Sequence, residues 1–308
     1  MLCIENNLPL KSDDLSGLVE KFLTFAQVKS ASVKSYRKGI KNLANFFSLQ
    51  GISQPTRENL IAYREYLAEN YSAATCNLYL TSAKLFFNFL FVEGILKENP
   101  AEHLKGLKID RSTHKKDALS SDMVKAILAT FDTSTLQGKR DKAIFALMAT
   151  AGLRTVEIIR ADVDDIAEKS GKYFLYVQGK GRNDKSECVQ IAPSVYSLIS
   201  DYLQARTDNG ENLFASLSHR NFGGRLNSTT ISILVKDIMR RAGFDSERLT
   251  AHSLRHTAAT VALQAGASLR QVQQVLRHKS VSVTEIYLHD LDRLTNNAES
   301  LVAEVFDI

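Results

Sequence analysis

The segment AHSLRHTAAT, residues 251–260, decides how the rest of this chain is interpreted. His252 and Arg255 lie three residues apart, so a helix places both side chains on one face. Leu254 and Ala258 mark the opposite face, which we expect to be buried. A guanidinium beside an imidazole, backed by apolar side chains, suits an anionic ligand such as phosphate. A surface histidine–arginine pair has the same spacing, so this segment needs support from elsewhere in the sequence.

A second segment, LRHKSVSVTEIYLH at residues 276–289, carries a histidine and a tyrosine. His278 precedes a short expected helix that Ser280 can cap, and Tyr287 lies within that helix. On its own, this pattern fits a half-buried structural tyrosine equally well.

Upstream, residues 140–158 read RDKAIFALMATAGLRTVEI and place an arginine directly after an apolar run. Arg154 follows Ala-Gly-Leu at an expected helix break, so its charge is directed partly inward and needs an anionic partner. Glu157, three residues later, can supply that partner as a plain salt bridge. Alternatively, Glu157 only orients Arg154 and leaves the guanidinium available for a phosphate.

A glycine-containing turn, GKGRNDK at residues 179–185, separates two strand-like segments and carries Lys180. A lysine on such a hairpin can reach over a ligand, although most turn lysines are simply solvated. The segment is not a nucleotide-binding P-loop, because neither GxxxxGKS nor GxxxxGKT is present and no strand-to-helix turn follows.

Helical periodicity dominates the first third of the chain and predicts a small helical domain over residues 1–104. We expect helices near 13–27 and 56–70, together with two more that Ser30 and Ser72 can cap.

A basic linker is expected over residues 105–120, where periodicity is weak and lysines are frequent. Such a segment either contacts DNA phosphates or is an ordinary solvated loop. The candidate DNA contacts in this linker and in the domain that follows are Lys105, Lys108, Arg111, Lys115, Arg182 and Arg277.

A second domain, over residues 121–291, combines helices with a small antiparallel sheet. Three strand-like runs, at 163–167, 173–178 and 187–191, are separated by turn sequences. The tail at 292–308 has apolar residues at helical spacing and predicts a final helix. The other helices are expected near 121–131, 139–151, 194–206, 228–241, 251–264, 268–277 and 280–287. The expected fold class is mainly α with a small antiparallel β-sheet (α+β).

Composition excludes several classes of protein. The chain has 308 residues, a net charge of +5 and a pI of about 9.0, a mild excess that permits a nucleic-acid partner. Its three cysteines form no CxxC pair, which disfavours a zinc site and fits a reducing cytoplasm. No signal sequence is recognisable, and no apolar run approaches the ~20 residues of a membrane span. We therefore expect a cytoplasmic protein without a membrane partner, and nothing in the sequence predicts a cofactor or a metal.

In this order, the segments resemble the tyrosine recombinase (phage integrase) family, in its simple two-domain Xer-, integron- or transposon-like form. The resemblance covers roughly residues 13–290, including a first third similar to the family's SAM-like core-binding domain. It implies a core-binding domain and a catalytic domain that form a C-shaped clamp around DNA. The family pattern of arginine, turn lysine, HxxR, histidine and tyrosine is matched by Arg154, Lys180, His252, Arg255, His278 and Tyr287.

The resemblance implies a mechanism that needs no cofactor. Tyr287 attacks a phosphodiester and forms a 3′-phosphotyrosine, while Arg154 and Arg255 clamp the non-bridging oxygens. His278 adds a hydrogen bond to the phosphate, and Glu157 supports Arg154.

Two other positions move protons in the implied mechanism. His252 is the expected base or proton relay for the tyrosine, and Lys180 is the expected acid that protonates the departing 5′-oxygen. The turn after Lys180 is slightly longer than the common form, so Lys185 is the alternative acid. Arg277 stands where the family often has glycine, and we expect it to add a basic side chain.

The implied partners are double-stranded DNA with a specific core site and three further copies of the chain, as a homo-tetramer on two DNA sites. The tail at 292–308 either docks into a neighbouring protomer or packs on its own domain. The expected function is integration, excision or resolution of DNA. The alternatives are a type IB topoisomerase-like relaxation activity and a DNA-binding regulator that has lost catalysis.

Overall fold

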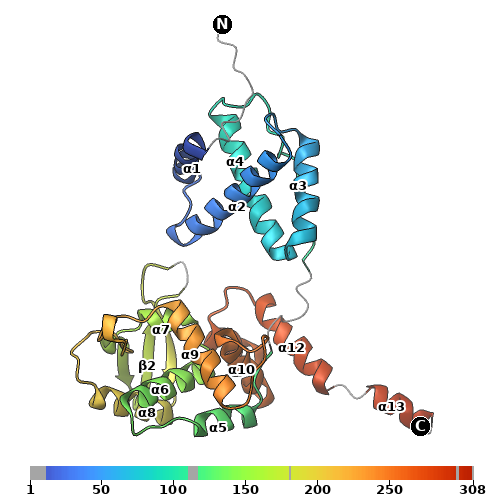
Figure 1. The fold of residues 1–308 in the computed structure, drawn as a ribbon. Helices are drawn as coiled ribbons and strands as arrows, with labels where there is room; N and C mark the ends of the chain where they lie inside the picture. The colour runs from blue at the N-terminus through green and yellow to red at the C-terminus, as the bar shows by residue number, and fades with distance from the viewer. Residues whose placement is uncertain (1–11, 110–116, 180–181, 296–297, 307–308) are drawn as a thin grey trace. The chain divides into compact units, whose positions relative to one another are not determined.

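The computed structural model describes residues 12–109, 117–179, 182–295 and 298–306. The chain divides into two compact units, Met1–Asp110 and Arg111–Ile308, which are described separately (Figure 1). Both are mainly helical, and the second also holds one three-stranded antiparallel sheet. The expected fold class is confirmed.

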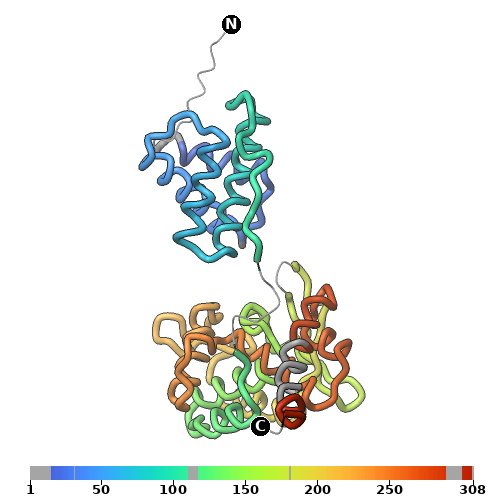
Figure 2. Tube along the Cα trace, turned by 90° about the vertical axis from the view of Figure 1, so that its right-hand side faces the viewer, coloured from blue at the N-terminus to red at the C-terminus, as the bar shows by residue number. Residues whose placement is uncertain are grey.

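In residues 12–109, the described part of the first unit, four helices surround an aromatic core. Figures 1 and 2 show the helices packed side by side, with α2 and α4 in extensive contact. Phe22 lies edge-on to Phe86, and Phe47 and Phe87 are fully buried beside them. The helices are α1 (Ser12–Phe25), α2 (Ser30–Leu49), α3 (Arg57–Asn70) and α4 (Ala73–Val92).

Side-chain caps start two of these helices. Ser72 accepts a hydrogen bond from the Thr75 N–H at the start of α4, as the sequence predicts. Thr56 and Asn59 form a reciprocal capping box at the start of α3. The prediction that Ser30 caps α2 is wrong, because Lys29 occupies the cap position and makes no side-chain cap bond.

The described ends of the predicted linker are each held by their own unit. Asn77 of α4 donates to the Leu107 carbonyl at 2.8 Å and accepts from its N–H at 2.7 Å. In the second unit, Leu119 is buried, and its N–H donates to the Thr257 hydroxyl at 2.8 Å. Lys105 and Lys108 have exposed side chains, whereas the predictions for Arg111 and Lys115 lie outside the described residues.

The second unit packs helices against a small sheet. The strands β1 (Ile166–Lys169), β2 (Lys172–Val177) and β3 (Glu187–Ile191) pair antiparallel in that order. The helices are α5 (Ser121–Ala129), α6 (Leu136–Ala151), α7 (Thr155–Arg160), α8 (Pro193–Ala205), α9 (Ser228–Arg241), α10 (Ala251–Gln264), α11 (Leu269–Leu276), α12 (Ser282–Thr295) and α13 (Ala298–Val305).

Helix α10 lies at the centre of the contacts among these helices. Helices α6 and α8 contact the sheet, α10 packs on α6, and α11 and α12 pack on α10. A small apolar cluster fills the space among the last three helices, and Tyr287 is one of its members. Residues that are more than a hundred positions apart in sequence therefore meet around α10.

Two elements begin or end elsewhere than the sequence predicts, and one helix is additional. The first strand starts at Ile166, since residues 163–165 form a 3₁₀ turn in which the Asp165 carboxylate accepts the Asp162 N–H. Helix α7 was not predicted, because six residues are too few for a periodic signal. Helix α12 continues without interruption to Thr295, beyond the predicted end near residue 287.

None of the helices described is long and apolar enough to cross a membrane. Over the same part of the chain, no group of three or more histidine, cysteine or acidic side chains is arranged to hold a metal ion.

Candidate active site

Arg255 is the most deeply buried of the predicted cations at the site. It lies on α10 with only 2% of its surface exposed. One terminal nitrogen donates to the Gly152 carbonyl at 2.6 Å, and the other donates to the Leu276 carbonyl. Burial, followed by the charges of Arg154 and Arg277, lowers its pKa to about 9, which still leaves the guanidinium charged at neutral pH.

Gly152 makes this bridge possible. The residue ends α6 in the left-handed conformation, with φ at 59°, which glycine adopts without the penalty of a side chain. A Cβ at this position would lie 2.7 Å from the Leu276 side chain. The absence of a side chain therefore lets the backbone before Arg154 approach the backbone before His278.

Glu157 holds Arg154 by two hydrogen bonds. The Arg154 N–H donates to Oε2 at 2.8 Å, and its Nη1 donates to Oε1 at 2.9 Å. Glu157 is fully buried, whereas 28% of the Arg154 side chain is exposed. Burial works to raise the pKa of Glu157, but Arg277 and Arg154 hold it below the ordinary value. The carboxylate therefore stays ionised, and the guanidinium of Arg154 keeps donors that face outward.

Arg277 differs from the expectation of an exposed basic side chain. Its side chain is 4% exposed, and Nη2 donates to Glu157 Oε2 at 2.7 Å. The residue also has a positive φ of 54°. The buried carboxylate, which is distant in sequence, draws the side chain inward and away from the surface where a DNA contact was expected.

His278 lies beside this group of arginines. Its Nδ1 is 2.9 Å from the hydroxyl of Thr284, which is fully buried near the start of α12. Burial, followed by the charges of Arg255, Arg154 and Arg277, lowers the pKa of His278 to about 4. The imidazole is therefore neutral at physiological pH and can donate only one ring N–H.

Tyr287 lies between two histidines and is 3% exposed. Its ring is nearly parallel to that of His278, with 6.4 Å between centroids, and lies 5.4 Å from that of His256. The His256 ring in turn lies 4.7 Å from that of His252, whose side chain is exposed. His256 directly follows Arg255 on α10 and is 6% exposed.

The β2–β3 hairpin carries the predicted lysines. Lys180 lies outside the described residues. Lys185 donates to Asp162 at 2.7 Å and to Asp165 at 2.5 Å. Partial burial lowers the affinity of Lys185 for its proton, but these two carboxylates hold its pKa above the ordinary value. A lysine with a raised pKa releases its proton poorly, so this geometry disfavours Lys185 as the acid.

Arg182, the remaining candidate on the hairpin, is paired within the hairpin itself. Its Nη2 donates to Glu187 at 2.8 Å, and 38% of its side chain is exposed. This guanidinium can contact an anion only with the donors that Glu187 leaves available.

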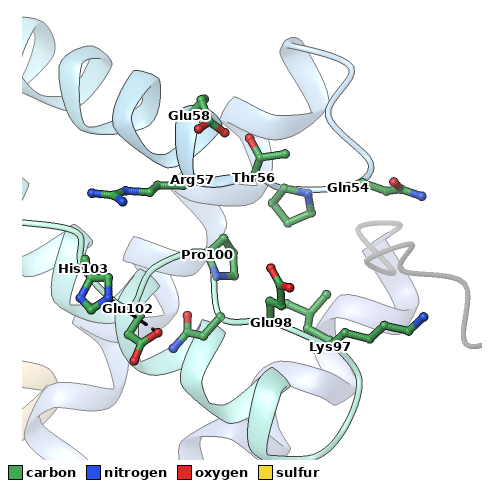
Figure 3. A pocket seen from close by; sticks show the side chains of 12 residues that line it. Gln54, Thr56, Arg57, Glu58, Lys97, Glu98, Pro100, Glu102 and His103 are labelled. Carbon is green, nitrogen blue, oxygen red and sulfur yellow. Dashed lines mark ion pairs between the residues drawn. The ribbon is translucent and has the colours of Figure 1, made fainter.

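A separate cavity of about 570 Å³ opens in the first unit (Figure 3). It is lined by residues 54–58 and by residues of the loop at 96–103, and it contains none of the predicted catalytic side chains. Arg57 and Lys97 point in opposite directions, so they do not converge on one anion. The charged side chains of both signs that line it are Arg57, Lys97, Glu58, Glu98 and Glu102.

The described part of the site therefore brings five predicted residues to one region around α10. Two adjacent backbone segments, ending in Arg154 and His278, are joined by Arg255. Tyr287 faces the same histidine from α12. Two arginines and a neutral histidine beside a buried tyrosine suit attack on a phosphate.

Two family models match the chain. The phage integrase family matches residues 117–293, and the phage integrase N-terminal SAM-like domain matches residues 17–93. Together they span most of both units.

Curated relatives match over nearly the whole chain. Tyrosine recombinase XerA of Pyrococcus horikoshii is 33% identical over 273 residues, which cover 88% of each protein. Tyrosine recombinase XerD of Listeria monocytogenes is 27% identical, over 89% of this chain and 94% of the relative.

Solved structures share the fold. The XerH site-specific recombinase bound to palindromic difH substrate has a TM-score of 0.74 and 18% identity, over 95% of this chain and 85% of that one. A lambda integrase tetramer bound to a Holliday junction has a TM-score of 0.67 and 18% identity, over 92% and 78%. With the family model covering more than half of its length and a relative at 33% identity, the chain belongs to the phage integrase family.

Proposed function

We propose that this chain is a site-specific DNA recombinase that cleaves and rejoins DNA through a 3′-phosphotyrosine at Tyr287. The observation that carries the proposal is the placement of Tyr287 against His278, within the group of cations that Arg154 and Arg255 belong to. A phosphodiester bound there would lie beside both the nucleophile and the charges that stabilise its transition state. The relatives named above are tyrosine recombinases, which supports this function.

Arg154 and Arg255 would bind the non-bridging oxygens of the scissile phosphate. Each guanidinium has five N–H donors. Arg255 uses two of them on backbone carbonyls, and those bonds fix the plane of the remaining donors. Fixed donors cost no reorganisation when negative charge develops on the phosphate.

His278 would act as a neutral hydrogen-bond donor to the phosphate. If the Thr284 hydroxyl donates to Nδ1, the remaining proton is on Nε2, which is the nitrogen free to face a ligand. The lowered pKa keeps this tautomer uncharged over the physiological range. Thr284 would therefore set the tautomer that the reaction needs.

Proton transfer completes the reaction. As the Tyr287 oxygen forms its bond to phosphorus, its proton would leave toward His252, the base or relay, in whose direction His256 lies. The bond from phosphorus to the 5′-oxygen breaks, and Lys180 would give that oxygen its proton. One phosphodiester-type ester replaces another, so no external energy source enters the balance. Rejoining is the same reaction with a different 5′-hydroxyl as the nucleophile.

The test of the nucleophile uses a suicide DNA substrate that traps the covalent complex. The variant Tyr287→Phe should bind a half-site normally and form no covalent complex. Tyr196→Phe is the matched control, since Tyr196 belongs to the same unit but stacks on Tyr173, and it should react like the wild type. Covalent product from Tyr287→Phe at the wild-type yield would rule out this nucleophile.

The acid is tested by changing the leaving group. A substrate with sulfur in place of the 5′-bridging oxygen needs little protonation, so it should rescue cleavage by Lys180→Ala but not by Arg255→Ala. Lys185→Ala should show no selective rescue, because Lys185 is committed to Asp162 and Asp165. Rescue of Lys185→Ala alone would transfer the acid's role to Lys185.

The same proposal includes DNA and protein partners. We propose that the two units form a C-shaped clamp on a specific double-stranded core site, with Lys105 and Lys108 contacting phosphates from the exposed segment between them. The activity would take place in the cytoplasm, where such a protein meets DNA. Integration, excision or resolution would follow from which two sites are paired. A relaxation enzyme or a silent regulator would neither pair two sites nor exchange strands.

A homo-tetramer on two DNA sites would be held together by the tail. Helix α13 and the residue after it expose four large apolar side chains, and Val305 is 79% exposed. We propose that a second copy of the chain covers them, which closes a ring when each protomer docks into the next. The exposed side chains are Leu301, Val302, Val305 and Phe306.

Truncation after Thr295 tests this docking, since it leaves α12 whole and removes α13. Half-site binding by one protomer should stay near the wild-type level, while synapsis of two sites and strand exchange should be lost. The full-length variant Val302→Ser should weaken synapsis less strongly, and Glu304→Gln serves as its control. Strand exchange by the truncated protein at the wild-type rate would exclude the docking.

A further inference from the structure

Arg277 occupies a backbone position that is ordinarily filled by glycine. It ends α11 in the left-handed conformation, with φ at 54°. A side chain in this conformation crowds the following carbonyl, which is why helices commonly end with glycine at this point. An arginine retained there has to be compensated by contacts of its side chain.

The contacts of the guanidinium are specific. The side chain is 4% exposed, and its Nη2 lies 2.7 Å from Glu157 Oε2. Its Nη1 donates to the Val275 carbonyl, within its own helix end. A surface arginine that serves only solubility or a diffuse attraction to DNA would keep its charge in water.

Arg277 and Arg154 share one carboxylate. Oε2 of Glu157 accepts both the Arg277 Nη2 proton and the Arg154 backbone N–H, and Oε1 accepts Arg154 Nη1. Both oxygens are thus fixed in direction. If Arg277 were absent, Oε2 would keep only one backbone donor, and the carboxylate could rotate about its last torsion angle.

We propose that Arg277 is a positioning residue for DNA cleavage, which holds the Glu157 carboxylate so that Arg154 presents its guanidinium to the scissile phosphate. This inference rests on the function proposed above. A transition state is sensitive to small misplacement of its charge-stabilising groups, so loss of this contact should slow chemistry more than binding.

The same contact ties the two halves of the site together. Arg277 directly precedes His278, whereas Glu157 belongs to α7, 120 positions earlier in the chain. Arg255 makes a parallel link between the same two segments. The titratable and charged groups that face His278 from the surrounding elements are Arg154, Arg255, Arg277, His252 and Tyr287.

The variant Arg277→Gly tests the proposal, because glycine fits the backbone and removes only the side chain. Single-turnover cleavage should fall about 10- to 100-fold, while half-site affinity stays within about twofold of the wild type. Arg277→Lys keeps a charge facing Glu157 and should recover part of the rate. Ser170→Gly is the matched control: it relieves another positive φ, at 52°, in an exposed turn, and should leave cleavage unchanged.

Two further measurements separate positioning from simple support of the fold. In a double-mutant cycle, the effects of Arg277→Gly and Glu157→Gln on the rate of single-turnover cleavage should be non-additive, because both variants remove the same contact. In the protein without DNA, the NMR titration of His278 should move to higher pH in Arg277→Gly, because one of the cations facing it has gone. If Arg277 only stabilised the fold, neither the non-additive cleavage rates nor the shifted titration of His278 would be observed.

The outcomes distinguish this inference from the proposed function. If the wild type forms no covalent complex with DNA, the proposed function fails. If the wild type reacts and Arg277→Gly cleaves at the same rate, only the role of Arg277 is wrong. Equal losses of binding and cleavage in Arg277→Gly, or additive effects with Glu157→Gln, would also overturn the positioning role.

Discussion

The cores of the two units contain different kinds of side chain. The first unit buries rings, among them Phe22, Phe47, Phe86 and Phe87, and its buried Tyr63 donates a neutral hydrogen bond to Asn42. The second unit has a larger, mostly aliphatic core and also buries ionised groups. The buried charged side chains of the second unit include Arg140, Asp141, Glu157 and Arg255.

This difference indicates that the first core mainly stabilises the fold, whereas the buried charges of the second serve the proposed reaction. Apolar burial is non-directional and tolerates repacking, so the first unit can be held by shape and area alone. Buried charges contribute little net stability, because removal from water offsets most of their attraction. In the reaction proposed above, Arg255 and the Arg154 held by Glu157 would supply donors of fixed direction to the scissile phosphate, which an apolar core cannot do.

Removal of a ring should cause the largest loss of stability. Phe86→Ala deletes a nearly fully buried ring that packs edge-on against Phe22, at a cost of about 3–5 kcal/mol. The loss should be confined to amide protons of the first unit in hydrogen exchange measured on the full chain. Equal loss of protection in both units would mean that the two cores unfold as one.

Replacement of the central arginine should damage chemistry in particular. Arg255→Lys cannot bridge the Gly152 and Leu276 carbonyls and also bind a phosphate, so cleavage should fall about 10²- to 10³-fold. The matched control is Arg140→Lys, since Arg140 is also buried but bonds Asp141 and the Ala215 carbonyl. Arg140→Lys should lower stability without a selective loss of cleavage. Equal losses of cleavage rate in Arg255→Lys and Arg140→Lys would contradict a specific role of Arg255 in the reaction.

A methyl group at Gly152 should cause a smaller, local effect. Gly152→Ala combines a positive φ with a clash against Leu276, which together cost about 1–3 kcal/mol. Gly171→Ala has a similar φ of 72° and open space around the new methyl, so it isolates the conformational part. Thermal unfolding should show the greater loss for Gly152→Ala, and only that variant should cleave DNA more slowly. Indistinguishable variants would show that the close approach to Leu276 is unimportant.

A pH dependence should give the smallest effect. The pKa of His278 is lowered to about 4, whereas an unfolded histidine titrates near about 6.5, so the unfolded chain takes up this proton first. The contribution of His278 to stability is therefore full above pH about 6.5 and is lost as the pH falls toward 4. His278→Gln should flatten that part of the curve, whereas His219→Gln, at an exposed site, should not. An unchanged curve for His278→Gln would contradict the buried, neutral imidazole.

Local sequence signals predicted the elements well where they were long. Helical periodicity and the cap at Ser72 indicated α4, and the structure contains both the helix and its cap. Helix α7 was too short to show periodicity, and the carboxylate of Asp165 converted the start of the predicted first strand into a turn. Periodicity describes faces of regular elements, so it fails where one side chain bonds the nearby backbone.

The identity of the site residues was easier to predict from the sequence than the contacts that they make. The order of Arg154, His252, Arg255, His278 and Tyr287 is visible in the sequence, and so is the Arg154–Glu157 pair. The burial of Arg277 was not predictable, because its partner Glu157 is 120 positions away. The carboxylates that hold Lys185 are likewise distant in sequence, at 20 and 23 positions. Local patterns carry no information on partners that only the fold brings together.

The uninterrupted course of α12 has a mechanical consequence. The helix continues for eight residues beyond Tyr287, to Thr295, which is a rigid extension of roughly 12 Å at 1.5 Å per residue. A tyrosine on a loop could be swung by rotation of a few backbone bonds, but a tyrosine in the middle of a helix moves only with the whole rod. A displacement of the end of α12 near residue 295 therefore also moves the side chain of Tyr287. In the reaction proposed above, whatever holds the C-terminal end of α12 would therefore also control when Tyr287 reaches the phosphate.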